Sequence, residues 1–205
     1  MNPDPGFVHV YEPGSSGRTL LLLHGTGGNE YDLLPLGKEL DPEAARLSPR
    51  GPVLENGHPR FFRRFAEGVF DLEDLKQRTN DLADFILGAA RDYQLDPGQI
   101  VAVGYSNGAN IAASILLRRP EVIRAAILLR AMVPFEPEQL PDLAGTKVWI
   151  AGGKEDTIIP RANTERLATM LSEAGAIVTA NFFDAGHGLT NTELVLARRW
   201  LEQLA

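Results

Sequence analysis

One serine in this chain lies where a nucleophile is expected. Ser106 stands in "VGYSNGAN", between Gly104 and Gly108, after an apolar run and before a run of small residues. On a tight strand-to-helix turn a serine hydroxyl points out of the sheet, and flanking glycines remove the β-carbons that would clash there. The N–H groups at the start of the next helix favour an oxyanion. The pattern indicates a serine nucleophile, although a glycine–serine turn without chemistry has the same spacing.

A serine hydroxyl is a poor nucleophile at neutral pH and needs a base, usually a histidine. Of the four histidines in the chain, only His187 follows Ser106. It lies in the glycine-flanked stretch "DAGHGLT", between the last expected strand and the last expected helix. In enzymes that carry the serine on such a turn, the chain order is serine, acid, histidine. His187 is therefore the predicted base.

A carboxylate must orient this histidine and stabilise its charged form. The stretch "GGKEDTIIP", which follows the strand before that of His187, offers Glu155 and Asp156. We predict Asp156 as the acid. The alternative is Glu155, with Asp156 as a cap of the turn. Asp184 is closer to His187 in the sequence and is interpreted as a turn or salt-bridge residue.

The oxyanion formed in acyl transfer needs two N–H donors. One is expected from Asn107, the residue after the serine. The other is expected from Thr26, in the glycine-rich stretch "HGTGGNE" after an early strand. This loop has neither a G-K-[ST] nor a G-x-G-x-x-G pattern, which argues against a phosphate-binding turn. His24 is interpreted as structural, with its ring bonded to the loop backbone.

The elements that must position these residues alternate between strand and helix. Strands are expected over 7–11, 18–25, 45–51, 100–105, 122–129, 146–153 and 176–183, and helices over 71–93, 107–120, 161–175 and 190–205. The stretch "EPGSSG" between the first two strands indicates a hairpin. The alternation predicts a mostly parallel sheet with helices on both faces, in a single α/β domain over 1–205. Ser106 and His187 are then expected at the same carboxyl edge of the sheet.

The composition limits the partners. The chain has 205 residues, of which 44% are hydrophobic and 23% charged, as in one globular domain. Its net charge of −7 argues against nucleic acid or an anionic membrane surface as the main partner. There is no cysteine, which excludes disulfides and thiolate chemistry. The N-terminus lacks the pattern of a signal peptide and no stretch approaches the ~20 apolar residues of a membrane span, so a cytoplasmic location is expected.

Several stretches together resemble the α/β-hydrolases of the phospholipase/carboxylesterase family, and more narrowly the bacterial hydrolases of the hydroquinone-resistance type. They are "LLLHGTGGNEYDLLPL", "SPRGPVLENGHPRFFRRFAEGVFD", "VAVGYSNGANIAASILL", "MVPF", "AGGKEDTIIP" and "AGHGLT", spread over most of the chain. The resemblance implies a shortened eight-strand-type sheet and hydrolysis of carboxylic esters without a metal or an organic cofactor. It implies a Ser106–Asp156–His187 triad, with Thr26 and Asn107 at the oxyanion hole.

Many hydrolases of this kind insert a helical cap between the strands expected here at 122–129 and 146–153. Only sixteen residues separate these strands, which leaves no room for a large cap. We therefore expect an open or shallow site for small to medium esters. Met132 and Val133 are expected to add an apolar wall, and ordinary loop packing is the alternative for both.

The long loop over 50–71 interleaves basic and aromatic residues, namely Arg60, Arg63 and Arg64 with Phe61, Phe62 and Phe65. Two interpretations stay open. In the first, phenylalanines such as Phe61 line an acyl or aromatic pocket, and an arginine, for which we favour Arg60, receives a substrate carboxylate. In the second, the aromatic rings anchor the loop and the arginines pair with nearby carboxylates. Those carboxylates are Glu55, Glu67 and Asp71.

The expected function is that of a serine carboxylesterase, which acts on a small-molecule ester through an acyl-enzyme on Ser106. The alternative is cleavage of a thioester or acyl transfer to an acceptor other than water, because both use the same acyl-enzyme. A ligand-binding protein without turnover would not need the triad. The expected assembly is a monomer or a homodimer.

Overall fold

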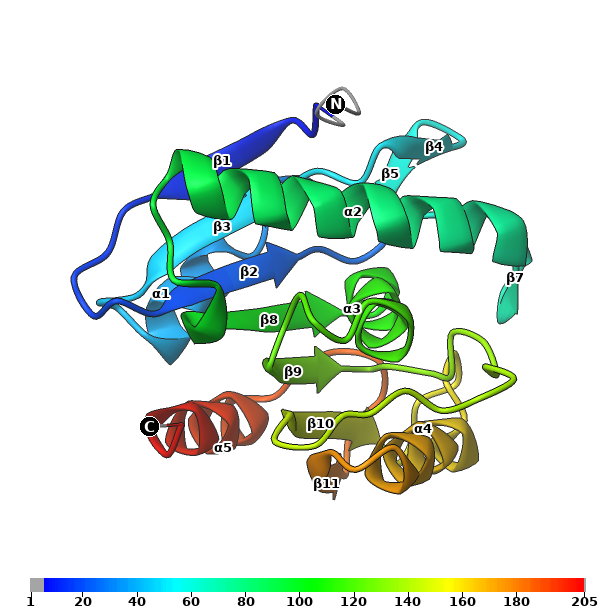
Figure 1. The fold of residues 1–205 in the computed structure, drawn as a ribbon. Helices are drawn as coiled ribbons and strands as arrows, with labels where there is room; N and C mark the ends of the chain where they lie inside the picture. Colours follow the sequence, from blue (N-terminus) through cyan, green and yellow to red (C-terminus); the bar gives the residue numbers. More distant parts are fainter. Residues whose placement is uncertain (1–5, 205) are drawn as a thin grey trace.

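Seven strands form one sheet in the computed structural model, which describes residues 6–204 (Figure 1). From edge to edge the strands are β1 (His9–Glu12), β3 (Ala45–Pro49), β2 (Thr19–Leu23), β8 (Ile100–Tyr105), β9 (Ala125–Leu129), β10 (Lys147–Gly153) and β11 (Ile177–Phe183). β1 is antiparallel to β3, and every other neighbouring pair is parallel. The mostly parallel sheet predicted from the sequence is confirmed.

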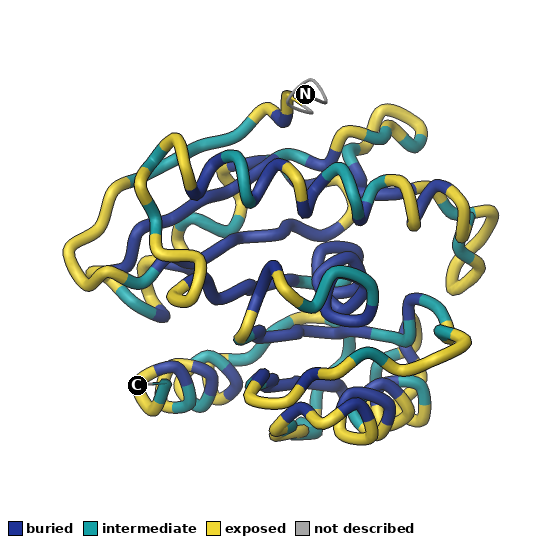
Figure 2. The backbone as a smooth tube through the Cα atoms, in the orientation of Figure 1, coloured by how far each residue is buried: buried dark blue, intermediate teal, exposed yellow. Residues whose placement is uncertain are grey.

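Helices cover both faces of this sheet, as predicted. One face carries α2 (Leu72–Asp92), α3 (Asn107–Arg118) and α4 (Arg161–Glu173), and the other carries α1 (Leu34–Leu40) and α5 (Asn191–Glu202). The core is therefore divided in two by the sheet. In β2, Leu21 and Leu23 pack into one half while Leu20 and Leu22 pack into the other, because successive side chains of a strand point to opposite faces. Figure 2 shows the central strands and α3 as the most buried segments.

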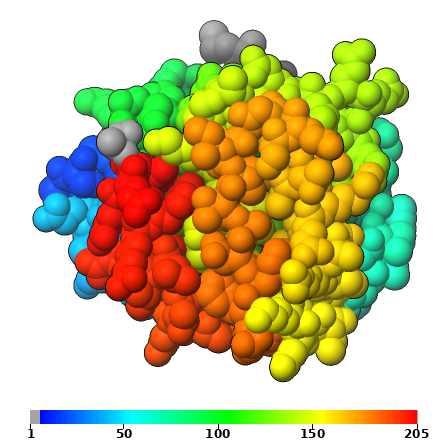
Figure 3. Space-filling view, turned by 90° about the horizontal axis from the view of Figure 1, so that it is seen from below, coloured from blue at the N-terminus to red at the C-terminus, as the bar shows by residue number. Residues whose placement is uncertain are grey.

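The last strand closes one edge of the sheet. In the view from below, the segment through β11 runs between α5 and α4 (Figure 3). β11 is partly exposed along its length, as an edge strand is expected to be. Within residues 6–204, every helix is too short or too polar to cross a membrane.

The predicted hairpin between the first two strands is wrong. β1 pairs with β3, with His9 opposite Pro49, and β3 lies between β1 and β2. The connection after β1 instead runs along the segment before β3, where the N–H groups of Ser15 and Ser16 both donate to the carbonyl oxygen of Glu43. β3 therefore has a partner strand on each side, and all five of its residues are buried.

The long loop also contains pairing that was not predicted. β4 (Val53–Glu55) pairs with β5 (His58–Arg60), and β6 (Arg64–Ala66) pairs with β7 (Val69–Phe70). Asn56 and Gly57 both have positive φ angles, 51° and 83°, which is the turn that an Asn-Gly pair favours in a hairpin. Residues 50–71 are thus two small hairpins rather than an irregular loop.

Candidate active site

Ser106 alone connects β8 to α3. Its φ of 52° and ψ of −113° lie outside the favoured regions for a residue with a β-carbon. The turn is fixed on both sides, because the Ser106 N–H donates to the carbonyl oxygen of Leu129 at 2.8 Å and the Ser106 carbonyl accepts from the Asn110 N–H at 2.9 Å. A strained residue held in this way is a mark of a functional site.

The two flanking glycines are required by close packing. A β-carbon at Gly104 would lie 2.5 Å from the carbonyl oxygen of Gly108, and one at Gly108 would overlap the carbonyl of Leu23 at the end of β2. The first turn of α3 therefore packs directly against the backbone of the sheet. This packing directs the N-terminus of α3 to the edge of the sheet at which β2 and β8 end.

A series of hydrogen bonds links Ser106 to the ends of two other strands. Nε2 of His187, which follows β11, is 3.0 Å from Ser106 Oγ, and Nδ1 is 2.8 Å from Oδ2 of Asp156, which follows β10. The Asp156 side chain is 1% exposed and that of His187 is 20% exposed. The structure thus brings the predicted nucleophile, base and orienting acid into line at the carboxyl edge of the sheet.

The surroundings of Asp156 keep its carboxyl ionised. Oδ1 accepts hydrogen bonds from the N–H groups of Ile158 and Ile159, at 2.8 and 3.0 Å. Burial raises the pKa of the Asp156 carboxyl, but the hydrogen bonds from these amides and from His187 outweigh burial and bring the pKa below its usual value. The Glu155 side chain is exposed instead. Asp184 forms an exposed ion pair with Lys154 at 2.7 Å, as a salt-bridge residue should.

Thr26 and Asn107 face the same site from two elements. Thr26 lies in the loop after β2, and Asn107 is the first residue of α3. Among residues 6–204, neither backbone N–H donates to a protein acceptor. Both donors are therefore free for an oxygen bound next to Ser106. His24 holds the loop before Thr26, because its ring bonds to the Gly25 carbonyl and to the Gly51 N–H, as interpreted from the sequence.

Three consecutive residues of the long loop, the 59–61 segment, connect to both donor positions. The Pro59 carbonyl accepts from the Gly27 N–H at 2.9 Å. Arg60 Nη1 donates to Thr26 Oγ1 at 2.7 Å, and the Phe61 N–H donates to Oδ1 of Asn107 at 2.8 Å. The 59–61 segment therefore sets the position of Thr26 relative to Asn107. The sequence reasoning missed this role, because two of the three bonds use backbone atoms.

Of the four predicted substrate contacts, two line the site and two pack in or on the core. Arg60 lines the site, but its residue is 2% exposed and its guanidinium also bonds to Glu55 and to the Phe62 carbonyl, both at 3.2 Å. Phe61 lies in the core against the His24 ring rather than at the pocket wall. Met132 lines the site. Val133 packs on the core.

The ion pairs expected under the second interpretation of the long loop are all present. They are Arg60–Glu55, Arg64–Glu55, Arg64–Glu67 and Arg63–Asp71. Arg64 lines the cavity that also contains Ser106. Its side chain is 24% exposed and is therefore partly accessible from that cavity.

Two adjoining cavities open at Ser106. The outer cavity has a volume of about 250 Å³ and is lined by Thr26, Arg64, Glu67, Tyr105, Ser106, Ile158 and His187. The inner cavity has a volume of about 30 Å³, and its lining includes Gly68, Asn107, Asn110, Met132, Ile159 and Ser106. The two linings share five residues, so the cavities adjoin; the shared residues are Thr26, Arg64, Glu67, Ser106 and Ile158.

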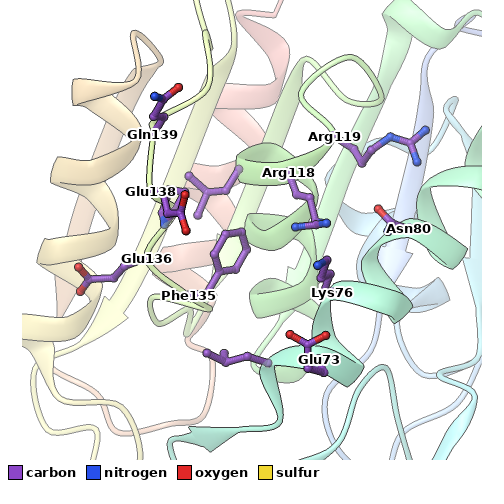
Figure 4. Close-up of a pocket in the computed structure, with 12 residues that line it drawn as sticks. Glu73, Lys76, Asn80, Arg118, Arg119, Phe135, Glu136, Glu138 and Gln139 are labelled. Atoms are coloured by element: carbon purple, nitrogen blue, oxygen red, sulfur yellow. The ribbon is translucent and has the colours of Figure 1, made fainter.

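A larger pocket, of about 710 Å³, lies away from Ser106 (Figure 4). It is formed by the first turns of α2, the last turn of α3 and residues 135–139. Lys76 and Arg118 point toward one another beside Phe135, with Glu73 and Glu138 nearby. The lining holds three basic and three acidic side chains, so its charge favours neither anions nor cations. Within residues 6–204, no three His, Asp or Glu side chains are grouped as metal ligands.

The sheet order and the sharp turn between β8 and α3 are those of the α/β-hydrolases. The model of the dienelactone hydrolase family matches residues 58–195. The chain belongs to this family, and it is a hydrolase by that membership.

Its relatives agree with this assignment. The chain is 51% identical over 195 residues to MhqD of Bacillus subtilis (strain 168), a protein named as a hydrolase, and the match covers 95% of this chain and 98% of MhqD. The Bacillus cereus carboxylesterase is 50% identical with a TM-score of 0.93, over 95% of this chain and 92% of that one. The Mesorhizobium loti carboxylesterase is 32% identical with a TM-score of 0.87, over 93% and 90%. The resemblance to bacterial α/β-hydrolases of this type, indicated by the sequence, is confirmed.

Proposed function

We propose that this protein is a serine carboxylesterase that hydrolyses small to medium carboxylic esters through an acyl-enzyme on Ser106. The observation that carries the proposal is the hydrogen-bond series from Ser106 Oγ through His187 to Asp156. The names of the two solved carboxylesterases support the choice of ester as the bond that is cleaved.

In the first half of the reaction, His187 Nε2 accepts the proton of Ser106 as Oγ attacks the ester carbonyl carbon. The carbonyl oxygen becomes an oxyanion, which the N–H groups of Thr26 and Asn107 stabilise. Asp156 holds the ring in the tautomer with the proton on Nδ1 and stabilises the imidazolium that forms. His187 then gives the proton to the alcohol oxygen, and the alcohol leaves.

In the second half, water replaces the alcohol. His187 removes a proton from the water as its oxygen attacks the acyl carbonyl, and the same two N–H groups bind the second oxyanion. Collapse of this intermediate returns the proton to Ser106 Oγ and releases the carboxylic acid. A panel of p-nitrophenyl esters and acyl-CoA thioesters, with product analysis, tests the proposal. Turnover of thioesters alone, or an acylated acceptor in place of the free acid, would contradict it.

The two cavities indicate which half of the ester is small. We place the alcohol in the outer cavity of about 250 Å³, because His187, which protonates the leaving alcohol, lines it. The acyl group then lies toward the inner cavity, whose volume of about 30 Å³ is that of roughly one water molecule and favours a very short acyl chain. Met132→Ala enlarges the inner cavity. This variant is expected to shift the preference toward longer acyl chains by about fourfold in kcat/KM per added methylene, the equivalent of about 0.8 kcal/mol.

Rates on p-nitrophenyl esters from acetate to octanoate measure this shift. Val133→Ala is the matched control, because Val133 packs on the core next to Met132 in the chain. An unchanged chain-length profile in Met132→Ala would place the acyl group elsewhere.

Arg60 tests the interpretation of the long loop. Its guanidinium already bonds to Thr26, Glu55 and the Phe62 carbonyl, so Arg60→Ala is expected to slow neutral and acidic esters alike, by about tenfold each. A guanidinium that received a substrate carboxylate would contribute about 1.5–3 kcal/mol to acidic esters only. Values of kcat/KM for a matched pair of esters, one with a free carboxylate, separate the two. A loss at least tenfold larger for the acidic ester would restore Arg60 as a carboxylate site.

A further inference from the structure

Arg130, directly after β9, is held in two unfavourable states at once. Its φ is 58°, in the left-handed region that favours glycine over residues with a β-carbon. Its side chain is 0% exposed, and burial of a charge carries a desolvation penalty that an ion pair often only balances. The reaction steps described above use no atom of Arg130. A residue with both a strained backbone and a buried charge is a candidate for a function in the site.

The contacts of Arg130 surround His187. Nε donates to the Gly186 carbonyl at 3.0 Å, and Nη2 donates to the Gly188 carbonyl at 2.6 Å. These are the two carbonyl groups on either side of His187. Nε also lies 3.9 Å from Oδ2 of Asp156, the oxygen that bonds to the His187 ring.

A buried carboxylate fixes the guanidinium itself. Nη1 and Nη2 donate to the two oxygens of Glu193, at 3.0 and 2.7 Å, and the Glu193 side chain is also 0% exposed. Glu193 lies in the first turn of α5, which Thr190 caps. The planar guanidinium fork thus joins α5 to the loop that carries His187.

Few other bonds hold the centre of this loop. The Phe183 and Ala185 carbonyls bond to backbone N–H groups before His187. Within residues 6–204, the next three carbonyls accept hydrogen bonds from side chains alone. Arg130 donates to the carbonyls of Gly186 and Gly188, and the Tyr105 hydroxyl donates to that of His187 at 3.0 Å. Arg130 supplies two of these three bonds.

We propose that Arg130, fixed by Glu193, is the positioning residue for His187: its fork holds the backbone on both sides of the histidine, so that the ring spans Asp156 and Ser106. The inference rests on the proposed esterase function. A buried ion pair can often be replaced by apolar side chains with little change in stability. The replacement of Arg130 also removes the donors to the Gly186 and Gly188 carbonyls, which costs some stability, but the larger effect is expected on the rate of the reaction.

The double variant Arg130→Met/Glu193→Met tests the proposal, because it leaves no unpaired buried charge. We expect kcat to fall by about 100-fold, KM to change by less than about threefold and the melting temperature to stay within a few degrees. The matched control is Lys154→Met, which removes the exposed Lys154–Asp184 ion pair between β10 and the His187 loop, with kcat expected to stay within about twofold.

A chemical rescue gives a readout that a purely structural residue would not show. Arg130→Gly accepts the left-handed backbone without strain and leaves a space of guanidinium shape. Millimolar methylguanidinium is expected to raise its kcat by at least about tenfold, with no effect on wild type or Lys154→Met. This rescue, with the loss in kcat of the double variant, would support the proposal.

Three results would overturn it. They are a folded double variant with kcat within about threefold of wild type, a double variant that does not fold, and an Arg130→Gly protein that is folded but not rescued. Ser106→Ala, assayed in parallel, separates this inference from the proposed function. If Ser106→Ala remains active, the esterase mechanism fails. If it is inactive while the double variant is fully active, only the role of Arg130 fails.

Discussion

Replacement of Ser106 by alanine is expected to lower kcat for esters by about 10³-fold or more and to abolish labelling by a fluorophosphonate. The variant removes the oxygen that forms the proposed acyl-enzyme, and under that mechanism His187 and Asp156 are left with no group to activate. The fold should be kept, because the hydrogen bonds that hold the turn use the backbone of residue 106 rather than its hydroxyl. Steady-state kinetics and mass spectrometry of the labelled protein measure both effects.

Ser172→Ala is the matched control, because it removes an exposed serine hydroxyl on α4. It should keep its rate and its label. Turnover by purified Ser106→Ala within about tenfold of wild type would show that the nucleophile lies elsewhere.

Asp156→Asn is expected to lower kcat by about 10²–10⁴-fold. The amide can still accept hydrogen bonds from Ile158 and Ile159 through its oxygen, so the loop should keep its shape. It then presents the NH₂ group to His187, where the carboxylate oxygen accepted a bond. The ring loses both its orienting acceptor and the charge that stabilises the imidazolium.

Glu155→Gln serves as the control for this prediction, because its side chain is exposed next to Asp156 in the chain. Its kcat should stay within about threefold of wild type. The reverse ranking of the two variants would assign the acid to Glu155. Circular dichroism of both proteins would show whether any loss of rate reflects loss of structure.

The parts of the fold that depend on local sequence could be predicted. β8 begins and ends at the expected residues, 100 and 105, because an apolar run of that length between a turn and a Gly-x-Ser-x-Gly stretch has few other solutions. The order serine, acid, histidine along the chain likewise singled out three residues that the structure brings together. The first inference uses a stretch of about ten residues, and the second uses only the order of three such stretches along the chain.

The pairing of the first three strands could not be predicted in this way. A short connection with Pro and Gly favours a hairpin locally, but β3 pairs with both β1 and β2. A strand was expected over 45–51, but its sequence, "ARLSP", gave no sign that it lies between two others, because a basic residue such as Arg46 is rarely buried. Arg46 is tolerated there because its guanidinium pairs with Glu12 of β1 at 2.6 Å.

The contacts that hold the candidate site in place were not predicted from the sequence. Arg130 and Glu193 are 63 positions apart, and Arg60 and Thr26 are 34 apart. No spacing rule connects such pairs, since their contact depends on how the sheet and its loops pack. A charged residue directly after an apolar strand was the available sign for Arg130, and a basic residue at that point is more commonly exposed.

The 59–61 segment ties Thr26 and Asn107 to the hydrophobic core. The strands of residues 50–71 pair only within two small hairpins, but Phe61 and the neighbouring Phe62 are fully buried in the core on the α2 and α3 side of the sheet. Buried apolar contacts of this kind raise the free energy at which a segment opens. The hydrogen bonds to Thr26 and Asn107 are therefore expected to break in the same cooperative transition as the sheet, so that activity and global structure are lost over the same range of temperature.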